Sequence, residues 1–198
     1  MIKSKDDYKK YIQFDRIALG YSPKPNFKQK IKQLIWPDKT LEFEMALRKY
    51  EFYYNCRKKN IVWLIGYIYA RLHYRRISLE LNYSIHPNTF DYGLSLPHYG
   101  TIVINPNVRI GKFCRIHVGV NIGASGGADK VPHIGDNVYI GPGAILFGDI
   151  TIADNISIGA NSTVTKSFTQ PNITIAGSPA KMIKENTPSW NFNKKASI

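Results

Sequence analysis

An aliphatic residue recurs at every sixth position through the second half of the chain. Stepping by six from Ile104, ten of eleven positions carry Ile, Leu or Val, and Ala128 is the exception. A period of six is typical neither of an isolated helix nor of an ordinary strand. The position four residues further on is also mostly apolar or small. These second positions are Val108, Cys114, Val120, Val138, Ala144, Ile150, Ile156 and Ser162.

Three such hexads would make one triangular coil, with a short strand on each of three flat faces. Stacked coils would then bury both series of apolar side chains as continuous ladders. Cys114 belongs to a ladder, so we expect a packed thiol and not a nucleophile. Glycine often follows the leading aliphatic residue, which predicts tight corners with unusual backbone angles. These glycines are Gly111, Gly123, Gly135, Gly141 and Gly159.

The first half of the chain has a helical pattern instead. We predict helices over 27–35, 40–58 and 61–81, with Trp36-Pro37-Asp38 as a break and Thr40 as the N-cap of the second helix. The fold class is therefore mainly β: a left-handed parallel β-helix of hexapeptide repeats over 83–184, preceded by a basic α-helical segment over 1–82. Residues 185–198 would form a C-terminal tail. Aromatic residues on the helices are read as packing residues, namely Phe52, Tyr53, Tyr54, Trp63, Tyr67 and Tyr69.

One stretch, 126–132, interrupts the apolar pattern. It must leave the coil as a loop, and loops on rigid scaffolds commonly carry function. We therefore look there for substrate contacts.

Positive charge is concentrated in the helical segment. The chain has 27 Lys and Arg against 14 Asp and Glu, and residues 1–80 hold 18 of the basic and 8 of the acidic residues, which gives +10 of the total +13. Such a segment is compatible with peripheral contact to the inner membrane face or to an anionic polymer. No nucleic-acid-binding signature is present, so nucleic acid is not an expected partner.

Cysteine spacing and the amino terminus bear on metals and location. Cys56 and Cys114 form no CxxC or Cys/His cluster, so we predict no metal site and reduced thiols. No apolar stretch follows Met1, and the longest apolar run, 61–70, is too short to span a bilayer. We expect a cytoplasmic protein.

Three motifs resemble the hexapeptide-repeat acyltransferases, in particular their serine acetyltransferase branch and the members of it that occur with surface-polysaccharide biosynthesis. The resemblance covers about 83–184. Ile85-His86-Pro87 opens the first coil, the segment 96–104 contains Pro97-His98-Tyr99-Gly100, and the segment 175–181 closes the coil with Gly177-Ser178-Pro179-Ala180-Lys181.

This resemblance implies an acetyl-CoA-dependent enzyme that works as a homotrimer, with the donor held between subunits. It implies that His98 removes the proton of the acceptor hydroxyl and that the Ala124 backbone N–H stabilises the developing oxyanion. Lys181 would lie near a CoA phosphate. The residues expected to contact CoA are Gly123, Ala124, Ala160, Gly177, Pro179, Ala180 and Lys181.

Four departures from the branch concern the catalytic base, the acceptor and the CoA arm. Ser84 stands where an aspartate orients the catalytic imidazole in serine enzymes, Pro97 replaces an acidic residue, and Lys130-Val131 replaces an Arg-His pair that grips the amino acid. Pro142 supplies no backbone N–H at a corner that often holds the CoA arm. Candidate acceptor contacts are His117, Lys130 and His133.

The chain keeps the expected base, His98, but lacks most of the residues that grip the amino acid in the serine enzymes. This combination favours a sugar hydroxyl of a surface polysaccharide, or of its precursor, as the acceptor. The alternative is a serine O-acetyltransferase of cysteine biosynthesis. A third hypothesis, from another functional class, is a non-catalytic trimeric scaffold.

Overall fold

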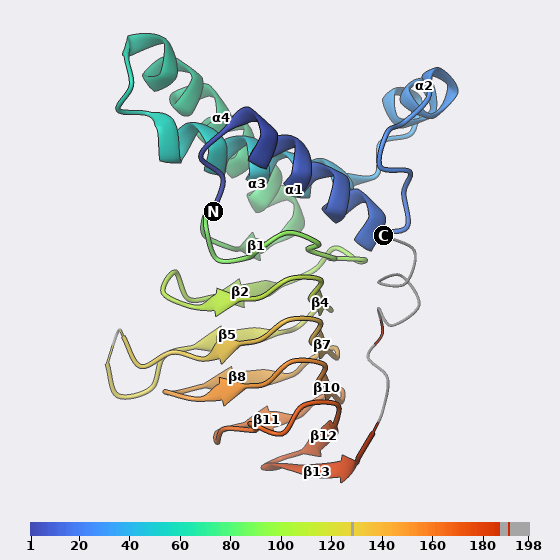
Figure 1. Ribbon diagram of the computed structural model, residues 1–198, viewed down its shortest axis with the longest axis vertical. Coiled ribbons are helices and arrows are strands. Elements are labelled where there is room, and N and C mark those ends of the chain that lie inside the picture. Colours follow the sequence, from blue (N-terminus) through green and yellow to red (C-terminus); the bar gives the residue numbers. More distant parts are fainter. Residues whose placement is uncertain (128, 187–189, 191–198) are drawn as a thin grey trace.

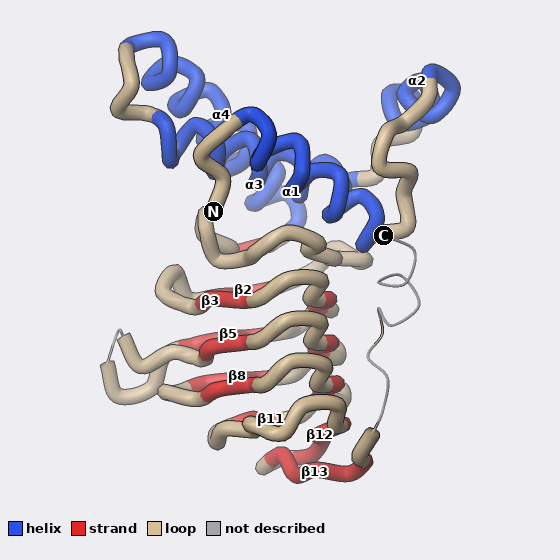
Figure 2. Tube along the Cα trace, viewed as in Figure 1, coloured by secondary structure: helices blue, strands red, loops and turns tan. Residues whose placement is uncertain are grey.

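The computed structural model describes residues 1–127, 129–186 and 190. A triangular stack of coils forms the body, and helices cover its amino-terminal end (Figures 1 and 2). The ladder position Ala128 and most of the predicted tail, 185–198, lie outside the described residues. The left-handed sense of the coil stays a prediction.

Four helices precede the coil: α1 (Lys5–Ala18), α2 (Phe27–Ile35), α3 (Lys39–Cys56) and α4 (Ile61–Leu81). The three predicted helices are confirmed, but the N-cap of α3 is Asp38 and not Thr40, because an Asp38 carboxylate oxygen accepts from the Thr40 and Leu41 backbone N–H groups at 2.9 and 3.3 Å. Helix α1 was missed. Its sequence signal is the capping box formed by Ser4 and Asp7.

The strands form three faces. The first face orders β1 (Tyr83–Ser84), β2 (Ile102–Ile104), β5 (Asn121–Gly123), β8 (Ile145–Phe147) and β11 (Thr163–Val164). The second face holds β3 (Arg109–Ile110), β6 (His133–Ile134) and β9 (Thr151–Ile152). The third face orders β4 (Arg115–Ile116), β7 (Tyr139–Ile140), β10 (Ser157–Ile158), β12 (Thr174–Gly177) and β13 (Ala180–Lys184). All strand pairs are parallel except β12 with β13.

Both predicted ladders are buried inside the prism. Each aliphatic residue of the first ladder, from Ile104 to Val164, is at most 5% exposed, and Val108 to Ser162 of the second ladder are buried as well. Cys114 is a core thiol, as predicted: its Sγ accepts from the Val138 N–H at 3.4 Å.

Glycine recurs for a different reason from the one predicted. Gly111, Gly135, Gly141 and Gly159 do not have positive φ angles; a Cβ at Gly111 or Gly141 would lie within 2.4 or 2.8 Å of the adjacent coil. Close stacking of the coils therefore demands glycine there. Left-handed backbone occurs two residues later in the hexad, at Phe113, Asn137, Gly143, Asn155 and Asn161.

Side-chain carboxylates cover the upper edge of the first coil, which has no preceding coil to pair with. Asp15 of α1 accepts from the Gly93 and Leu94 N–H groups at 2.7 and 2.9 Å. Glu44 accepts from Leu96 N–H at 2.8 Å, and Glu51 accepts from Asn88 N–H at 2.7 Å. Backbone groups that would otherwise be buried and unpaired are satisfied in this way.

Arg48 of α3 completes this cap. Its guanidinium is fully buried and donates to Asp15 at 2.7 Å and to Glu51 at 2.8 Å. It also donates to the carbonyls of Phe90 and Asp91, at 3.0 and 2.7 Å. One guanidinium thus pairs with two buried carboxylates and with two carbonyls of the coil edge.

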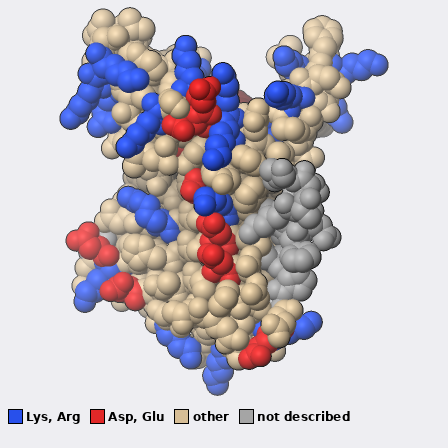
Figure 3. Space-filling model, viewed as in Figure 1, with Lys and Arg blue, Asp and Glu red and all other residues tan. Residues whose placement is uncertain are grey.

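The helical segment, residues 1–82, carries +10 of the formal net charge of +13. Lys and Arg gather over the helical end of the face shown in Figure 3. Within the part of the chain that the structure describes, no helix combines the length and apolar character needed to cross a membrane. Of the aromatic residues predicted to pack, Phe52 and Trp63 are in edge contact, whereas Tyr69 is 62% exposed.

A polar residue on the inner ladder should unfold the coil cooperatively. We expect Ile152→Asn to lower the free energy of unfolding by at least about 1–3 kcal/mol, because it buries an unpaired amide and loses packing. Thr151→Asn, on the exposed side of the same strand, is the matched control and should melt near the wild type. Equal melting temperatures for the two variants by circular dichroism would contradict the ladder assignment.

Glu44 should make stability depend on pH. Burial raises its pKa well above the ordinary value of 4.5, and Asp15 raises it further. As pH rises, the Glu44 carboxyl therefore ionises in the unfolded state before it ionises in the folded state. The free energy of unfolding falls by up to about 1.4 kcal/mol per pH unit until the folded-state pKa is reached. Glu44→Gln keeps an acceptor for Leu96 N–H and removes this dependence, so the variant should gain stability relative to the wild type between pH 5 and 8. Parallel denaturation curves across that range would contradict the assignment.

Candidate functional site

Corner residues of successive coils stack into one straight edge between the third and first faces. We call it the His98 edge; it comprises residues 97–101, 117–119, 141–143, 159–161 and 176–177. Gly143 N–H donates to the Val118 carbonyl at 2.9 Å, and Asn161 N–H donates to the Pro142 carbonyl at 2.8 Å. His98 and Gly177 are four coil levels apart, or roughly 19 Å at the usual strand spacing.

His98 lies at the top of this edge, in the first coil. Its side chain is exposed, and its carbonyl accepts from the Tyr83 hydroxyl at 2.6 Å, which fixes the backbone of the corner. Its ring centroid is 5.8 Å from that of His117, in the coil below. The structure therefore brings the predicted base together with one predicted acceptor contact.

His117 is partly buried between His98 and Tyr139, whose ring centroid is 5.1 Å away. Its Nε2 is buried and has no hydrogen-bond partner within the described part of the chain. Burial lowers the pKa of His117, and the positive charge of Arg115 and the neighbouring His98 lower it further. The imidazole is thus neutral at pH 7 and able to accept a proton.

The lower end of the edge is closed by the β12–β13 hairpin. Gly177 N–H donates to the Ser162 hydroxyl at 3.2 Å, and the Ser178 and Thr163 hydroxyls are 2.9 Å apart. Lys181 is exposed and pairs in register with Ala176, so its Cα lies next to the edge. Ala160 is exposed one level above Gly177. These predicted CoA contacts lie on the same edge as His98.

Gly123 and Ala124 lie on a different edge. Gly123 ends β5 and Ala124 follows it, so both stand at the far side of the first face, where Gly148 N–H donates to the Gly123 carbonyl at 3.4 Å. The loop that begins here leaves the prism as predicted, and its exposed Lys130 accepts through its carbonyl from Ser125 N–H at 3.1 Å. Within one chain the first face separates this loop from His98.

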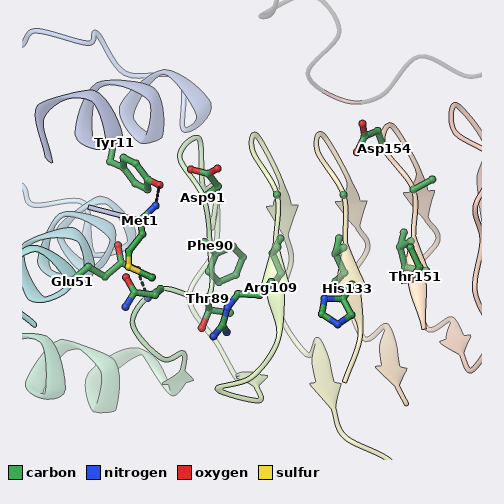
Figure 4. A pocket seen from close by; sticks show the side chains of 17 residues that line it. Met1, Tyr11, Glu51, Thr89, Phe90, Asp91, Arg109, His133, Thr151 and Asp154 are labelled. Atoms are coloured by element: carbon green, nitrogen blue, oxygen red, sulfur yellow. Dashed lines mark hydrogen bonds between the residues drawn. The ribbon is translucent and has the colours of Figure 1, made fainter. Parts of the chain in front are cut away.

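His133 points away from both edges. It belongs to β6 on the second face and lines a groove of about 540 Å³ with Phe90, Arg109 and Thr151 (Figure 4). A single chain therefore does not place it beside His98. No group of three or more His, Cys, Asp or Glu side chains able to hold a metal occurs among the described residues.

A cavity of about 620 Å³ lies directly beside His98, and sequence analysis did not anticipate it. Most of its lining comes from the helical segment, including Lys32 and Trp36, while Pro97, His98 and Tyr99 form the part that belongs to the coil. The sequence signal for this cavity is Trp36-Pro37-Asp38, whose pattern predicts only a helix break. Residues of the helical segment thus line a space that opens onto the predicted base.

Comparison with known proteins supports this reading of the coil. Residues 132–166 match the family model described as bacterial transferase hexapeptide (six repeats). Over these residues the coil is therefore similar to the hexapeptide repeats of bacterial transferases.

The named relatives are serine acetyltransferases. The enzyme of Staphylococcus xylosus is 36% identical over 123 residues, which are 61% of this chain and 56% of that protein. The enzyme of Mycobacterium tuberculosis is 35% identical over 96 residues, 48% of this chain and 42% of that protein. The chain thus spans about half the length of the curated relatives it matches. The expected closeness to polysaccharide O-acetyltransferases is not supported by these relatives.

Solved serine acetyltransferases share the architecture, helices included. The structure from Neisseria gonorrhoeae superposes with a TM-score of 0.70 at 28% identity, covering 96% of this chain and 72% of that one. The structure from Brucella abortus gives 0.71 at 26% identity, covering 93% and 71%.

The imidazole of His117 should titrate below the ordinary histidine pKa of 6.5. We expect its NMR titration midpoint under that value, and a rise in the midpoint in Arg115→Met, since this variant removes a nearby like charge. Arg109→Met, on the second face, is the control and should leave the midpoint unchanged. A wild-type midpoint at or above 6.5 would contradict the burial and charge assigned to this ring.

Proposed function

We propose that the protein transfers the acetyl group of acetyl-CoA to a hydroxyl oxygen, as an O-acetyltransferase. The observation that carries the proposal is the His98 edge, which aligns His98, Ala160 and the Gly177–Lys181 hairpin in one rigid row. The small residues Ala160 and Gly177 are exposed and leave the backbone at these two levels open to close approach by a ligand. The residues present therefore fit an extended acyl-CoA.

Acetyl-CoA supplies an activated thioester carbonyl. Lys181 would bind a phosphate at the far end, and the Gly177–Lys181 hairpin with Ala160 would hold the arm so that the acyl group reaches His98. His98 takes the proton of the acceptor hydroxyl as its oxygen attacks the carbonyl carbon. The carbon–sulfur bond then breaks, and the proton held by His98 leaves with the CoA thiol. His117, neutral and adjacent, would contact the acceptor.

A homotrimer would complete the site. The first face separates His98 from the Ala124 loop within one chain, and it exposes apolar Val103 and Ile145 at 39% and 43%. Packing three first faces around a threefold axis would cover these side chains and bring each His98 edge next to a neighbour's Ala124 loop. The Ala124 N–H could then stabilise the oxyanion across the interface.

Serine is the acceptor that the comparisons favour, because the named relatives are serine acetyltransferases. A sugar hydroxyl is the second candidate. The observation in its favour is the cavity of about 620 Å³ beside His98, which exceeds what one small amino acid would fill. A cytoplasmic location, with peripheral membrane contact through the basic helices, stays a prediction.

Thiol release from acetyl-CoA, measured with L-serine and with de-O-acetylated bacterial glycans, tests the activity and separates the two acceptors. Transfer to any hydroxyl supports the proposal. If the protein releases no thiol with any acceptor and also does not bind acetyl-CoA, the trimeric scaffold is favoured instead.

His98→Ala should lower turnover by roughly 10²–10⁴-fold, the usual contribution of a positioned general base. The Michaelis constant for acetyl-CoA should stay nearly unchanged, since His98 acts on the acceptor. Steady-state kinetics at saturating acceptor measure both values. Retained turnover would make His117 the next candidate for the base.

Lys181→Ala should show the opposite kinetic pattern. A phosphate contact remote from the thioester binds ground state and transition state alike, so the Michaelis constant for acetyl-CoA should rise with little loss of turnover. Lys184→Ala, in the same strand, is the control. A loss of turnover at saturating acetyl-CoA would contradict the role assigned to Lys181.

A further inference from the structure

The cavity beside His98 is built mainly by the part of the chain that is not a hexapeptide repeat. Helix α2, the loops on either side of it and the start of α3 supply ten of its fourteen lining residues, and α1 supplies Arg16. Pro97, His98 and Tyr99 supply the rest. An acceptor whose hydroxyl reaches His98 from this side would therefore be selected by the helical segment. This inference rests on the proposed acetyl transfer and concerns the chemical class of the acceptor.

Most charged groups of the lining already have partners. Asp38 accepts from the Tyr21 hydroxyl and from two backbone N–H groups of α3. Arg16 is buried and donates to a backbone carbonyl at 2.8 Å, and Lys39 pairs with two glutamates at 3.3 and 3.2 Å. Lys32 is exposed and forms no ion pair with any described residue. The charge left to meet a ligand is thus positive.

An aromatic side chain accompanies this cation. Trp36 is the C-cap of α2 and donates its backbone N–H to the Lys32 carbonyl at 2.8 Å, so the two residues are one helical turn apart, and both line the cavity. Trp36 is 82% exposed and Tyr99, on the coil side of the cavity, is 73% exposed. Flat apolar surfaces beside a cation suit a ligand that is a ring bearing an anionic group.

We propose that this cavity binds the acceptor as a sugar ring carrying a carboxylate or a phosphate. Lys32 binds the anionic group, Trp36 packs against the ring, and a ring hydroxyl faces His98. Lys32 and Trp36 are acceptor-binding residues and take no part in the proton transfer. Free serine shares a carboxylate with this class but has no ring for Trp36.

The test compares acceptors that differ in one group. Thiol release from acetyl-CoA is measured with glucose, galactose and N-acetylglucosamine, with the corresponding uronic acids, with the corresponding 1-phosphates, and with L-serine. We expect a lower Michaelis constant for the anionic sugars than for the neutral ones, and the better of the uronate and phosphate series identifies the anionic group.

Two variants with matched controls locate this preference. Lys32→Ala should raise the Michaelis constant for anionic sugars about 10- to 100-fold, the usual range for a hydrogen bond to a charged group, and leave neutral sugars unchanged. Lys30→Ala, exposed on α2 outside the lining, should change neither. Trp36→Ala should weaken all the sugars, with rescue by Trp36→Phe, whereas Ile35→Ala is the control. In every variant turnover at saturating acceptor should be kept.

A binding measurement without acetyl-CoA separates this inference from the proposed activity. Protein labelled with 5-fluorotryptophan reports Trp36 by ¹⁹F NMR, assigned through Trp36→Phe, and its signal should shift on titration with the preferred anionic sugar. A shift of the Trp36 signal without thiol release would support the proposed binding site and refute the proposed activity. Transfer to serine alone, or equal effects of Lys32→Ala and Lys30→Ala, would overturn the inference and leave the activity standing.

Discussion

The buried contact between Arg48, Asp15 and Glu51 is the interaction on which the rest of the structure depends. A stack of coils has an open first edge, and its backbone groups need partners before anything can be packed over them. Two carboxylates bound to one guanidinium supply acceptors for that edge, and the guanidinium supplies donors. Removing Arg48 alone would leave two buried charges without compensation.

The same contact positions the candidate chemistry. His98 belongs to the capped coil, and Glu44 holds Leu96 only two residues before it. Helices α1 and α3 are fixed to this coil. The loop between α1 and α2 therefore lies near the His98 corner, where Tyr21 and Ser22 line the cavity. The helical segment is therefore both the cover of the core and a wall of the site, which explains why one part of the chain could influence folding and acceptor choice together.

Sequence patterns predicted what repeats and missed what does not. The six-residue period gave the correct phase for Ile140 and Ile152, since every coil imposes the same environment on that position. The left-handed angles at Asn137 and Asn155 were missed, because asparagine tolerates them without the signal that glycine gives. The pairing of Arg48 with Asp15 spans 33 positions and has no period. The cavity could not be predicted either, because only the tertiary structure brings residues of α2 close to His98.

The hairpin at the other end of the prism bears on self-association. If the third face ended on the parallel strand β12, the unpaired lower edge of that strand could pair with another molecule and propagate into a filament. Instead β13 reverses direction against β12 and presents Lys181 and Lys184 along the outer strand. Like charges on two such strands would repel, which disfavours edge-to-edge association at this end. The same hairpin is expected to hold the nucleotide end of the donor.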